Sequence, residues 1–571
     1  MRPVAHPAVP FASAALHAVL LLSLLPTGAY AADRLRFVET SLTFPGAAVA
    51  LVSADVDGDG NLDLAVFVVG SRWGEAVTWE SSRMDEVEGL VEVMTVVPTL
   101  FDRRELWLYL GDGEGGLRSA GPPLEMPLSV LSLARGHGEM PLLALTDEGV
   151  AAVVWEPEAT SGSLVLVPVV TDPPILTGSG AFVPGLRLTS DVDGDGTPEL
   201  LLPARDGIAI YRGTPEGFAP EPAVRGLAPP REPGGVSGAP SLAYPLPEVG
   251  DVTGDGQADL VWQDPTRGWR RPWVAVHRGG LVFDDPRPVF ESDPDAPDVA
   301  DPLASLASIP AEPAATDEVE ALHYGDLDGD GRAELVVLVM DAEPEDLGMR
   351  KSIRWAESPP GTAFVHPTQA GFAPAAASRE SFRIQGYAFT GNESEFQLPG
   401  GFRDLNGDGR LDLVTLTLQI SVTRLLGGLA VGRVTLPMDF HVWCQEAGGA
   451  FRPVAGLDLS GKFRLDIGDL KVRNLPSFAG DFDGDGRTDF VQLGRGTKVT
   501  IHTGDAGCAF PSRADLTLRL KKEPEHIDLV RVEDFDGDGR SDLVVTHPLP
   551  RREADVVPPT RLDLYLSGGQ P

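Results

Sequence analysis

The chain has 571 residues, of which 84 are Asp or Glu and 46 are Lys or Arg, so its formal net charge at pH 7 is −38. A surface of this sign repels nucleic acid and anionic membranes, and neither is an expected partner. The 65 glycines and 51 prolines leave few stretches for helix, and the apolar segments are short, β-branched and bounded by turn residues. The composition therefore predicts an all-β protein.

The first 31 residues have the features of a secretory signal peptide. Arg2 precedes an apolar core over residues 14–25, and residues 29–31 are Ala-Tyr-Ala, a cleavage-site pattern. A membrane anchor is the alternative, but this apolar run is shorter than the roughly 20 residues that a span needs. Residue 32 is Ala rather than Cys, which argues against a lipid anchor. We expect a secreted protein, periplasmic or extracellular, with residues 1–31 as the signal peptide and 32–571 as the folded domain.

An acidic loop of nine residues that runs directly into an apolar strand recurs along the rest of the chain. It is DVDGDGNLD at Asp55, and further copies begin at Asp191, Asp251, Asp326, Asp404, Asp481 and Asp534. The first interval is about twice as long as the others, and a degraded copy without the loop carboxylates fits within it, from Leu133 to Trp155. A period of tens of residues is typical of a solenoid, propeller or array.

Each repeat predicts four short antiparallel strands. In the copy at Asp191, GLRLTS precedes the loop, ELLLPA follows it, GIAIYRG forms a third strand and FAPEPAV a fourth. Four such strands make one blade of a β-propeller. The last copy supplies only three strands before the chain ends, so we expect residues 34–44 to complete it and close the ring. We predict eight blades, with seven as the alternative because the copy at Leu133 is degraded.

The loop itself offers a set of hard oxygen ligands. In the first copy these are Asp55, Asp57, Asp59, the carbonyl of Asn61, and Asp63. Such a set suits Ca²⁺ better than Mg²⁺, and it contains no soft ligand for zinc or copper. An EF-hand is the alternative, but an EF-hand needs an acidic residue at position 12 and a helix on each side. No copy has an acidic residue at position 12, and a strand follows position 9 at once.

The DxDGDGxxD loop followed by an LDLVV-type strand resembles the FG-GAP repeat of integrin α-subunits and its bacterial relatives, also called VCBS repeats. The resemblance implies a β-propeller with calcium in the loop between the first two strands of a blade, here at about seven sites. It implies that positions one, three, five and nine bind through side chains and position seven through its carbonyl. The implied ligands are Asp55, Asp57, Asp59, Asn61, Asp63, Asp191, Asp193, Asp195, Thr197, Glu199, Asp251, Thr253, Asp255, Gln257, Asp259, Asp326, Asp328, Asp330, Arg332, Glu334, Asp404, Asn406, Asp408, Arg410, Asp412, Asp481, Asp483, Asp485, Arg487, Asp489, Asp534, Asp536, Asp538, Arg540 and Asp542.

Three copies depart from the repeat pattern in ways that should affect calcium binding. Thr253 and Asn406 replace the third-position Asp in their loops, so we expect weaker binding there, and the copy at Leu133 should bind no calcium.

The two cysteines, Cys444 and Cys508, are 64 residues apart, about one repeat. That separation would place them on neighbouring repeats, where a disulfide could form; two buried free thiols are the alternative.

No catalytic motif stands out in the sequence. There is no HExxH, and a GxGxxG match beginning at Gly111 precedes LRSAGPP, which cannot open a helix. Basic residues are spread through the repeats without a motif. We therefore expect a monomeric binding or adhesion protein for an extracellular protein or glycan rather than an enzyme. The alternative is an extracellular polysaccharide lyase on a propeller scaffold, which the resemblance alone does not establish.

Overall fold

The computed structural model describes nineteen stretches of the chain. They are residues 36–70, 102–113, 115–156, 163–174, 186–204, 206–230, 246–263, 272–289, 318–341, 358–368, 371–388, 401–419, 428, 432–466, 471–474, 476–494, 496–525, 529–550 and 557–568. The predicted signal peptide lies outside them. In these stretches no helix is both long enough and apolar enough to cross a membrane.

The described elements are β-strands, and they form eight main antiparallel sheets that we number as blades in chain order. Blade 1 contains β2 (Ala47–Ala54), β3 (Asp63–Gly70), β4 (Arg103–Gly111), β5 (Leu117–Ser119) and β6 (Leu124–Glu125). Blade 2 contains β7 (Val130–His137), β8 (Met140–Thr146), β9 (Val150–Glu156) and β10 (Ser163–Val170). Blade 3 contains β11 (Thr189–Ser190), β12 (Glu199–Ala204), β13 (Gly207–Tyr211) and β16 (Val224–Leu227), with a small hairpin of β14 (Gly213–Thr214) and β15 (Gly217–Phe218) beside it. Blade 4 contains β17 (Glu248–Gly250), β18 (Asp259–Trp262), β19 (Trp273–Ala275) and β20 (Arg287–Pro288).

The second half of the chain repeats this arrangement. Blade 5 contains β21 (Glu318–Gly325), β22 (Glu334–Met340), β23 (Pro360–Pro367) and β24 (Glu380–Gln385). Blade 6 contains β25 (Gly401–Arg403), β26 (Asp412–Leu418), β27 (Arg433–Gln445), β28 (Phe451–Pro453), β29 (Ser460–Asp466) and β30 (Lys471–Asn474). Blade 7 contains β31 (Pro476–Phe478), β32 (Phe490–Leu493), β33 (Lys498–His502) and β34 (Leu516–Arg519). Blade 8 contains β35 (Val530–Glu533), β36 (Asp542–Pro548), β37 (Thr560–Gly568) and β1 (Arg36–Phe44).

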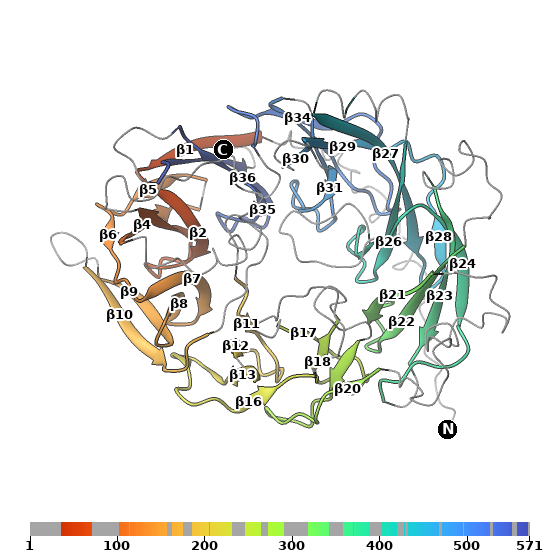
Figure 1. The fold of residues 1–571 in the computed structure, drawn as a ribbon, viewed down its shortest axis with the longest axis horizontal. Coiled ribbons are helices and arrows are strands. Elements are labelled where there is room, and N and C mark those ends of the chain that lie inside the picture. The colour runs from red at the N-terminus through yellow and green to blue at the C-terminus, as the bar shows by residue number, and fades with distance from the viewer. Residues whose placement is uncertain are drawn as a thin grey trace, which may run out of the picture.

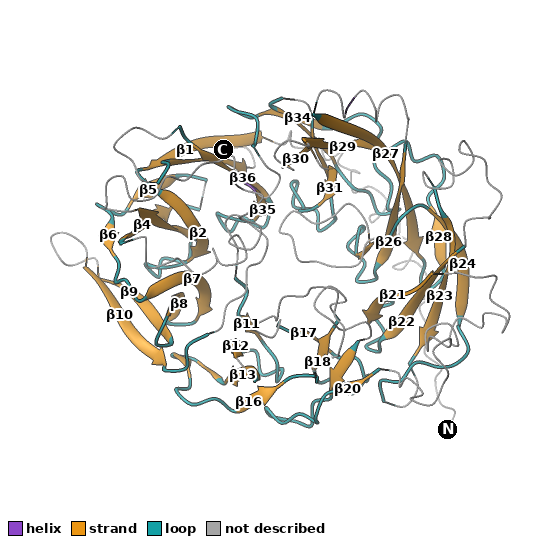
Figure 2. Ribbon diagram, in the orientation of Figure 1, coloured by secondary structure: helices purple, strands orange, loops and turns teal. Residues whose placement is uncertain are grey.

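The eight sheets stand around a ring, and the colour gradient of Figure 1 follows the chain around it. Strands such as β2, β11, β17 and β35 lie toward the centre, whereas β10, β16, β20 and β1 lie on the outside (Figure 1). Figure 2 shows the same ring as strands joined by loops. The predicted all-β propeller with eight blades is confirmed, and the seven-blade alternative is wrong because the degraded copy forms blade 2.

The last sheet joins the two ends of the described chain. β1 pairs with β37 along its whole length, from Arg36 opposite Gly568 to Phe44 opposite Thr560. A side-chain hydrogen bond of 2.6 Å from the Ser41 hydroxyl to Asp563 Oδ1 crosses the same strand pair. β1 thus gives blade 8 a fourth strand, although three strands of that blade come from the C-terminal end of the chain.

The hydrophobic core is a series of layers between neighbouring blades. Between blades 8 and 1, for example, Leu562 and Leu564 pack in one buried cluster with Leu51 and Val66. Each blade has a neighbour on both faces, so most residues of its second strand are buried; in β3 all eight are. This explains why the strands after the acidic loops are continuous apolar runs rather than alternating ones. Each fully buried large aliphatic side chain contributes about 1.5–3 kcal/mol of hydrophobic stabilisation.

Candidate metal sites

The acidic loops join the first and second strands of their blades, and their glycines set the backbone course. In the first loop, Gly58 and Gly60 have φ angles of 75° and 92°, a region that side chains other than glycine rarely adopt. The glycines at the fourth and sixth positions of the other six loops also have positive φ. The carboxylate of Asp55 accepts hydrogen bonds from both glycine N–H groups, at 2.8 and 3.0 Å. The DGDG pattern is therefore required by the turn as well as by any ion.

The same hydrogen bonds recur around the ring. The first Asp of each of the other six loops accepts these two backbone bonds at 2.6–3.0 Å. The fifth residue accepts a bond of 2.8–3.0 Å from the N–H of the seventh in all seven loops. The seven loops are thus copies of one structure.

The ninth residue of each loop is a buried carboxylate. At most 2% of the surface of any of these seven residues is exposed. One oxygen accepts a bond of 2.8–3.0 Å from the N–H of the second loop residue. In six blades the other oxygen accepts a backbone N–H at or just beyond the end of the third strand, at 2.6–3.3 Å. The sequence indicated this residue as a ligand but gave no sign that it also ties the loop to the third strand.

Burial raises the pKa of these ninth-position carboxyl groups, and nearby loop aspartates raise it further. The pKa reaches about 6 for Asp412, about 7 for Glu334 and Asp489, and about 8 for Asp542. The third-position Asp483 also has a pKa raised to about 6, by burial and by the charges of its loop neighbours. Raised values mean that negative charge is costly at these positions unless a cation offsets it.

The side chains of the first, third and ninth positions converge. In the first loop, one carboxylate oxygen from each of Asp55, Asp57 and Asp63 lies within 4.8 Å of the others. The same grouping occurs at Asp191, Asp193 and Glu199, at Asp326, Asp328 and Glu334, and at Asp481, Asp483 and Asp489. Convergent anionic oxygens with raised pKa values fit a hard divalent cation that accepts many oxygens. These residues would hold calcium, and the ion would neutralise carboxylates that otherwise repel one another.

Arginines lie against some of the candidate ligands. Arg212 forms a 2.9 Å ion pair with Asp193, a third-position residue. In blade 5, Arg379 contacts both Asp328, at 2.6 Å, and Glu334, at 3.1 Å. There the guanidinium takes the place of the backbone N–H that reaches the ninth carboxylate in the other six acidic loops. The sequence did not reveal this arginine as part of a loop, because it lies 45 residues beyond Glu334.

The two substituted third positions make local hydrogen bonds. The Thr253 hydroxyl lies 3.4 Å from Asp251 Oδ1, and the Asn406 amide donates to Asp408 Oδ2 at 2.9 Å. Each therefore interacts with a carboxylate of its own loop. The weaker calcium binding expected at these two loops remains a prediction.

Successive loops are joined to each other through backbone hydrogen bonds. The N–H of Leu411 donates to the carbonyl of Leu327 in the preceding loop at 2.8 Å. Thr488 N–H donates to the Leu405 carbonyl at 3.0 Å, and Ser541 N–H donates to the Asp481 carbonyl at 2.6 Å. The acidic loops of blades 5 to 8 thus form a row that is connected by hydrogen bonds.

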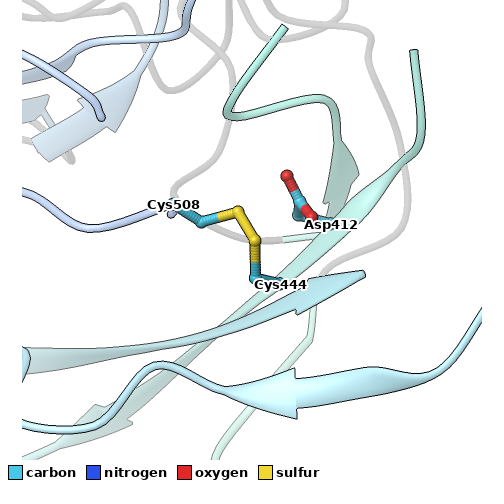
Figure 3. A group of neighbouring side chains, drawn as sticks. All are labelled: Asp412, Cys444 and Cys508. Atoms are coloured by element: carbon cyan, nitrogen blue, oxygen red, sulfur yellow. A yellow bond between two sulfur atoms is a disulfide. The ribbon is translucent and has the colours of Figure 1, made fainter. Parts of the chain in front are cut away.

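The two cysteines form a disulfide between blades 6 and 7. Cys444 lies near the end of β27 and Cys508 follows β33, with their Cα atoms 5.8 Å apart. The prediction that they lie on neighbouring repeats is confirmed, and the free-thiol alternative is wrong. Figure 3 shows the bridge beside Asp412, and one ligand atom of each of the three residues lies within 4.8 Å of the others. Because the sulfurs are bonded to each other, they offer no thiolate to a metal, and Asp412 serves the acidic loop alone.

The GxGxxG match beginning at Gly111 is a turn. It lies between β4 and β5, and the N–H of Asp112 donates to the Gly116 carbonyl at 3.1 Å across it. A strand rather than a helix follows at Leu117, so the match provides no helix N-terminus for a dinucleotide phosphate.

Comparison with known proteins identifies the repeat. A family model described as FG-GAP-like repeat matches residues 191–262 and 474–545, and each match contains two of the acidic loops. No curated protein matches the chain.

Two of the solved structures that match the chain show how limited the similarity is. One, on the recognition of non-reducing terminal N-acetylglucosamine by an Agrocybe aegerita lectin, is 12% identical with a TM-score of 0.37, over 80% of this chain and 92% of that one. The other, TcdB2-TccC3, is 14% identical with a TM-score of 0.25, over 89% of this chain and 24% of that one. This chain therefore spans less than a quarter of the length of the second structure. The eight sheets show that the chain is a β-propeller, and two stretches of it match the FG-GAP-like repeat.

Proposed function

We propose that the protein is a secreted, calcium-stabilised propeller that serves as a binding or adhesion module for an extracellular protein or glycan. The observation that carries the calcium role is the convergence of first, third and ninth carboxylates around one point in a loop whose backbone is already ordered. A preordered set of hard oxygen ligands binds calcium without a large cost in chain entropy.

The calcium ions would have a structural role. The same site recurs in seven of the eight blades, and its ninth carboxylate is bonded to the third strand in six of them. A device repeated in this way suits stabilisation of every blade better than chemistry at one place. Ion binding that occurs only in the folded ring adds its free energy to folding.

Binding is favoured over the lyase alternative by the residues around a basic cavity between blades 6 and 7, which is described below. Among the described residues, arginines and lysines line it together with Thr, Gln, Leu and Gly, and neither His nor Tyr does. A cluster of cations with Tyr or His would supply an acid and base for elimination. Cations alone supply attraction for an anion.

Two measurements test the proposal. Metal analysis of the dialysed protein is expected to find about seven calcium ions per chain, one for each acidic loop. A glycan array and a pull-down of surface proteins, each with calcium and with EDTA, are expected to give ligands that are retained only with calcium. Absence of bound calcium would contradict the metal role, and turnover of a polyuronate would contradict the binding role.

A further inference from the structure

A basic cavity of about 470 Å³ lies between blades 6 and 7. Its cationic residues are Arg433 on β27, Lys462 and Arg464 on β29, and Lys498 on β33. Among the residues that the structure describes, no Asp or Glu lines it, although the chain as a whole has a net charge of −38. The four cations come from three strands that are separated in sequence, so the sequence alone showed no motif.

The cavity depends on an extra hairpin in blade 6. The first half of β27 pairs with β29 instead of with β28, with Thr435 opposite Arg464 and Pro437 opposite Lys462. Since side chains two residues apart lie on one face of a strand, Lys462 and Arg464 share a face. β29 pairs with β30 and also lies next to β31 of blade 7 (Figure 1). The hairpin thus brings the cations of blade 6 to the face of the neighbouring sheet.

Charge within the cavity is concentrated and partly shielded from water. Only 13% of the Arg464 side chain is exposed, and its guanidinium lies 3.5 Å from Glu523. Arg433, Lys462 and Lys498 line the cavity with this arginine, so an anion in it would lie near four positively charged side chains.

We infer that this cavity binds a small ligand that bears an oxyanion, a carboxylate or a sulfate, on a body the size of a sugar. Guanidinium groups recognise the paired oxygens of such anions through two parallel hydrogen bonds. Thr435, Gln492 and Thr500 also line the cavity and can hydrogen-bond neutral hydroxyl groups. The volume lies within the range of about 300–1,000 Å³ typical of small-molecule sites. The inference rests on the proposed binding function and names its ligand class.

The cavity is separate from the candidate calcium site of the same blade. Asp489, the ninth carboxylate of that blade, directly precedes β32, whereas Gln492, Leu493 and Gly494 line the cavity at the other end of that strand. A bound cation and a bound anion therefore occupy opposite ends of the strand. Anion binding can be measured without competition for the carboxylates.

The test is isothermal titration calorimetry of the mature chain with calcium present. The probes are glucuronate, glucose 6-sulfate and neutral glucose. We expect at least one of the two acidic sugars to bind, with affinity that falls as salt rises, and glucose to give no measurable heat. The comparison of the two acidic probes distinguishes a carboxylate from a sulfate ligand. Equal binding of glucose, or binding of none of the three, would overturn the inference.

Substitution of two exposed lysines locates the site. The double variant Lys462→Gln/Lys498→Gln is expected to bind the acidic probe about tenfold more weakly or worse, because each charge-assisted hydrogen bond contributes about that factor. Lys522→Gln, a partly exposed lysine paired with Glu525 outside the cavity, is the matched control and should bind normally. Unchanged affinity of the double variant would refute the site. The calcium content of both variants is measured as well. If it is unchanged, a loss of anion binding comes from the cavity and not from a failure of the proposed calcium role.

Discussion

Blade 2 and the seven blades with acidic loops make the same connection between their first two strands in different ways. In blade 2 only Gly138 and Glu139 separate β7 from β8, and Met140 begins the second strand. In most of the other blades, a buried carboxylate begins that strand, as Asp63 does in β3. Blade 2 is nevertheless a complete sheet of four strands.

The turn of blade 2 is secured by packing on its neighbour. His137 Nε2 lies 3.0 Å from the carbonyl oxygen of Gly217 in the β14–β15 hairpin of blade 3, and the His137 ring meets Phe218 edge to face at 4.9 Å between centroids. A blade therefore does not need the acidic loop in order to form. The acidic loops therefore add charge that must be neutralised, and metal should matter to seven blades and not to blade 2.

The largest effect of a single substitution is expected at a ninth-position carboxylate. Asp489 accepts hydrogen bonds from the N–H groups of Phe482 and Gly504 at 2.8 and 3.0 Å. Asp489→Ala leaves both donors buried and unpaired and removes a metal ligand, which we expect to cost about 3–5 kcal/mol. Glu139→Ala, at the exposed turn of blade 2, is the matched control and should change stability by less than about 0.5 kcal/mol. Thermal melts of both variants with calcium measure the difference, and equal melting temperatures would show that the ninth carboxylate does not stabilise its blade.

The pH dependence of the metal-free protein should be the next largest effect. The folded-state pKa values of Asp412, Asp489 and Asp542 are raised to about 6, 7 and 8, above the ordinary carboxyl value near 4. A group whose pKa is raised on folding destabilises the folded state once it ionises, so stability should fall as pH rises from about 4 to 8. With EDTA present, we expect a higher melting temperature at pH 5.5 than at pH 8.

Calcium should remove or reverse that trend. The ion binds the ionised carboxylates, so the melting-temperature difference between calcium and EDTA should widen as pH rises through the same range. Circular dichroism melts across this pH range provide the measurement. If the metal-free protein instead becomes more stable toward pH 8, the pKa values of these carboxylates are not raised on folding.

The smallest effect is expected at His137. His137→Ala removes the contact with Gly217 and the edge-to-face contact with Phe218, at a cost of about 1 kcal/mol. Because blade 2 has no acidic loop, the shift in melting temperature should be the same with calcium and with EDTA. A His137→Ala effect that appears only with EDTA would mean that the turn of blade 2 depends on metal in the neighbouring blades.

The sequence was enough to predict the ring. The period of the acidic loop, the strands around Asp191 and the unpaired strand before Phe44 led to eight blades, and the degraded copy at Leu133 was found by its spacing. Those features are local in the chain, and repeats of one sequence pattern form repeats of one structure. The separation of the two cysteines by about one repeat placed them on neighbouring blades for the same reason.

The rest depends on contacts between distant segments. Arg379 reaches Glu334 from a later strand, and the N–H of Gly504 reaches Asp489 only after β32 and β33 are paired. The basic cavity depends on the pairing of β27 with β29, which no local pattern predicted. Tertiary placement of this kind is invisible in a single sequence, because any of several strands could have paired there.

The role of calcium in the acidic loops is tested most directly by the thermal stability of the purified protein. It is measured with calcium, after chelation by EDTA, and after calcium is restored. We predict a marked fall in melting temperature on chelation and full recovery with excess calcium, since the ion binds the folded loops and not the unfolded chain. An unchanged melting temperature with EDTA would show that the acidic loops do not depend on calcium, and it would contradict the proposal that calcium stabilises the propeller.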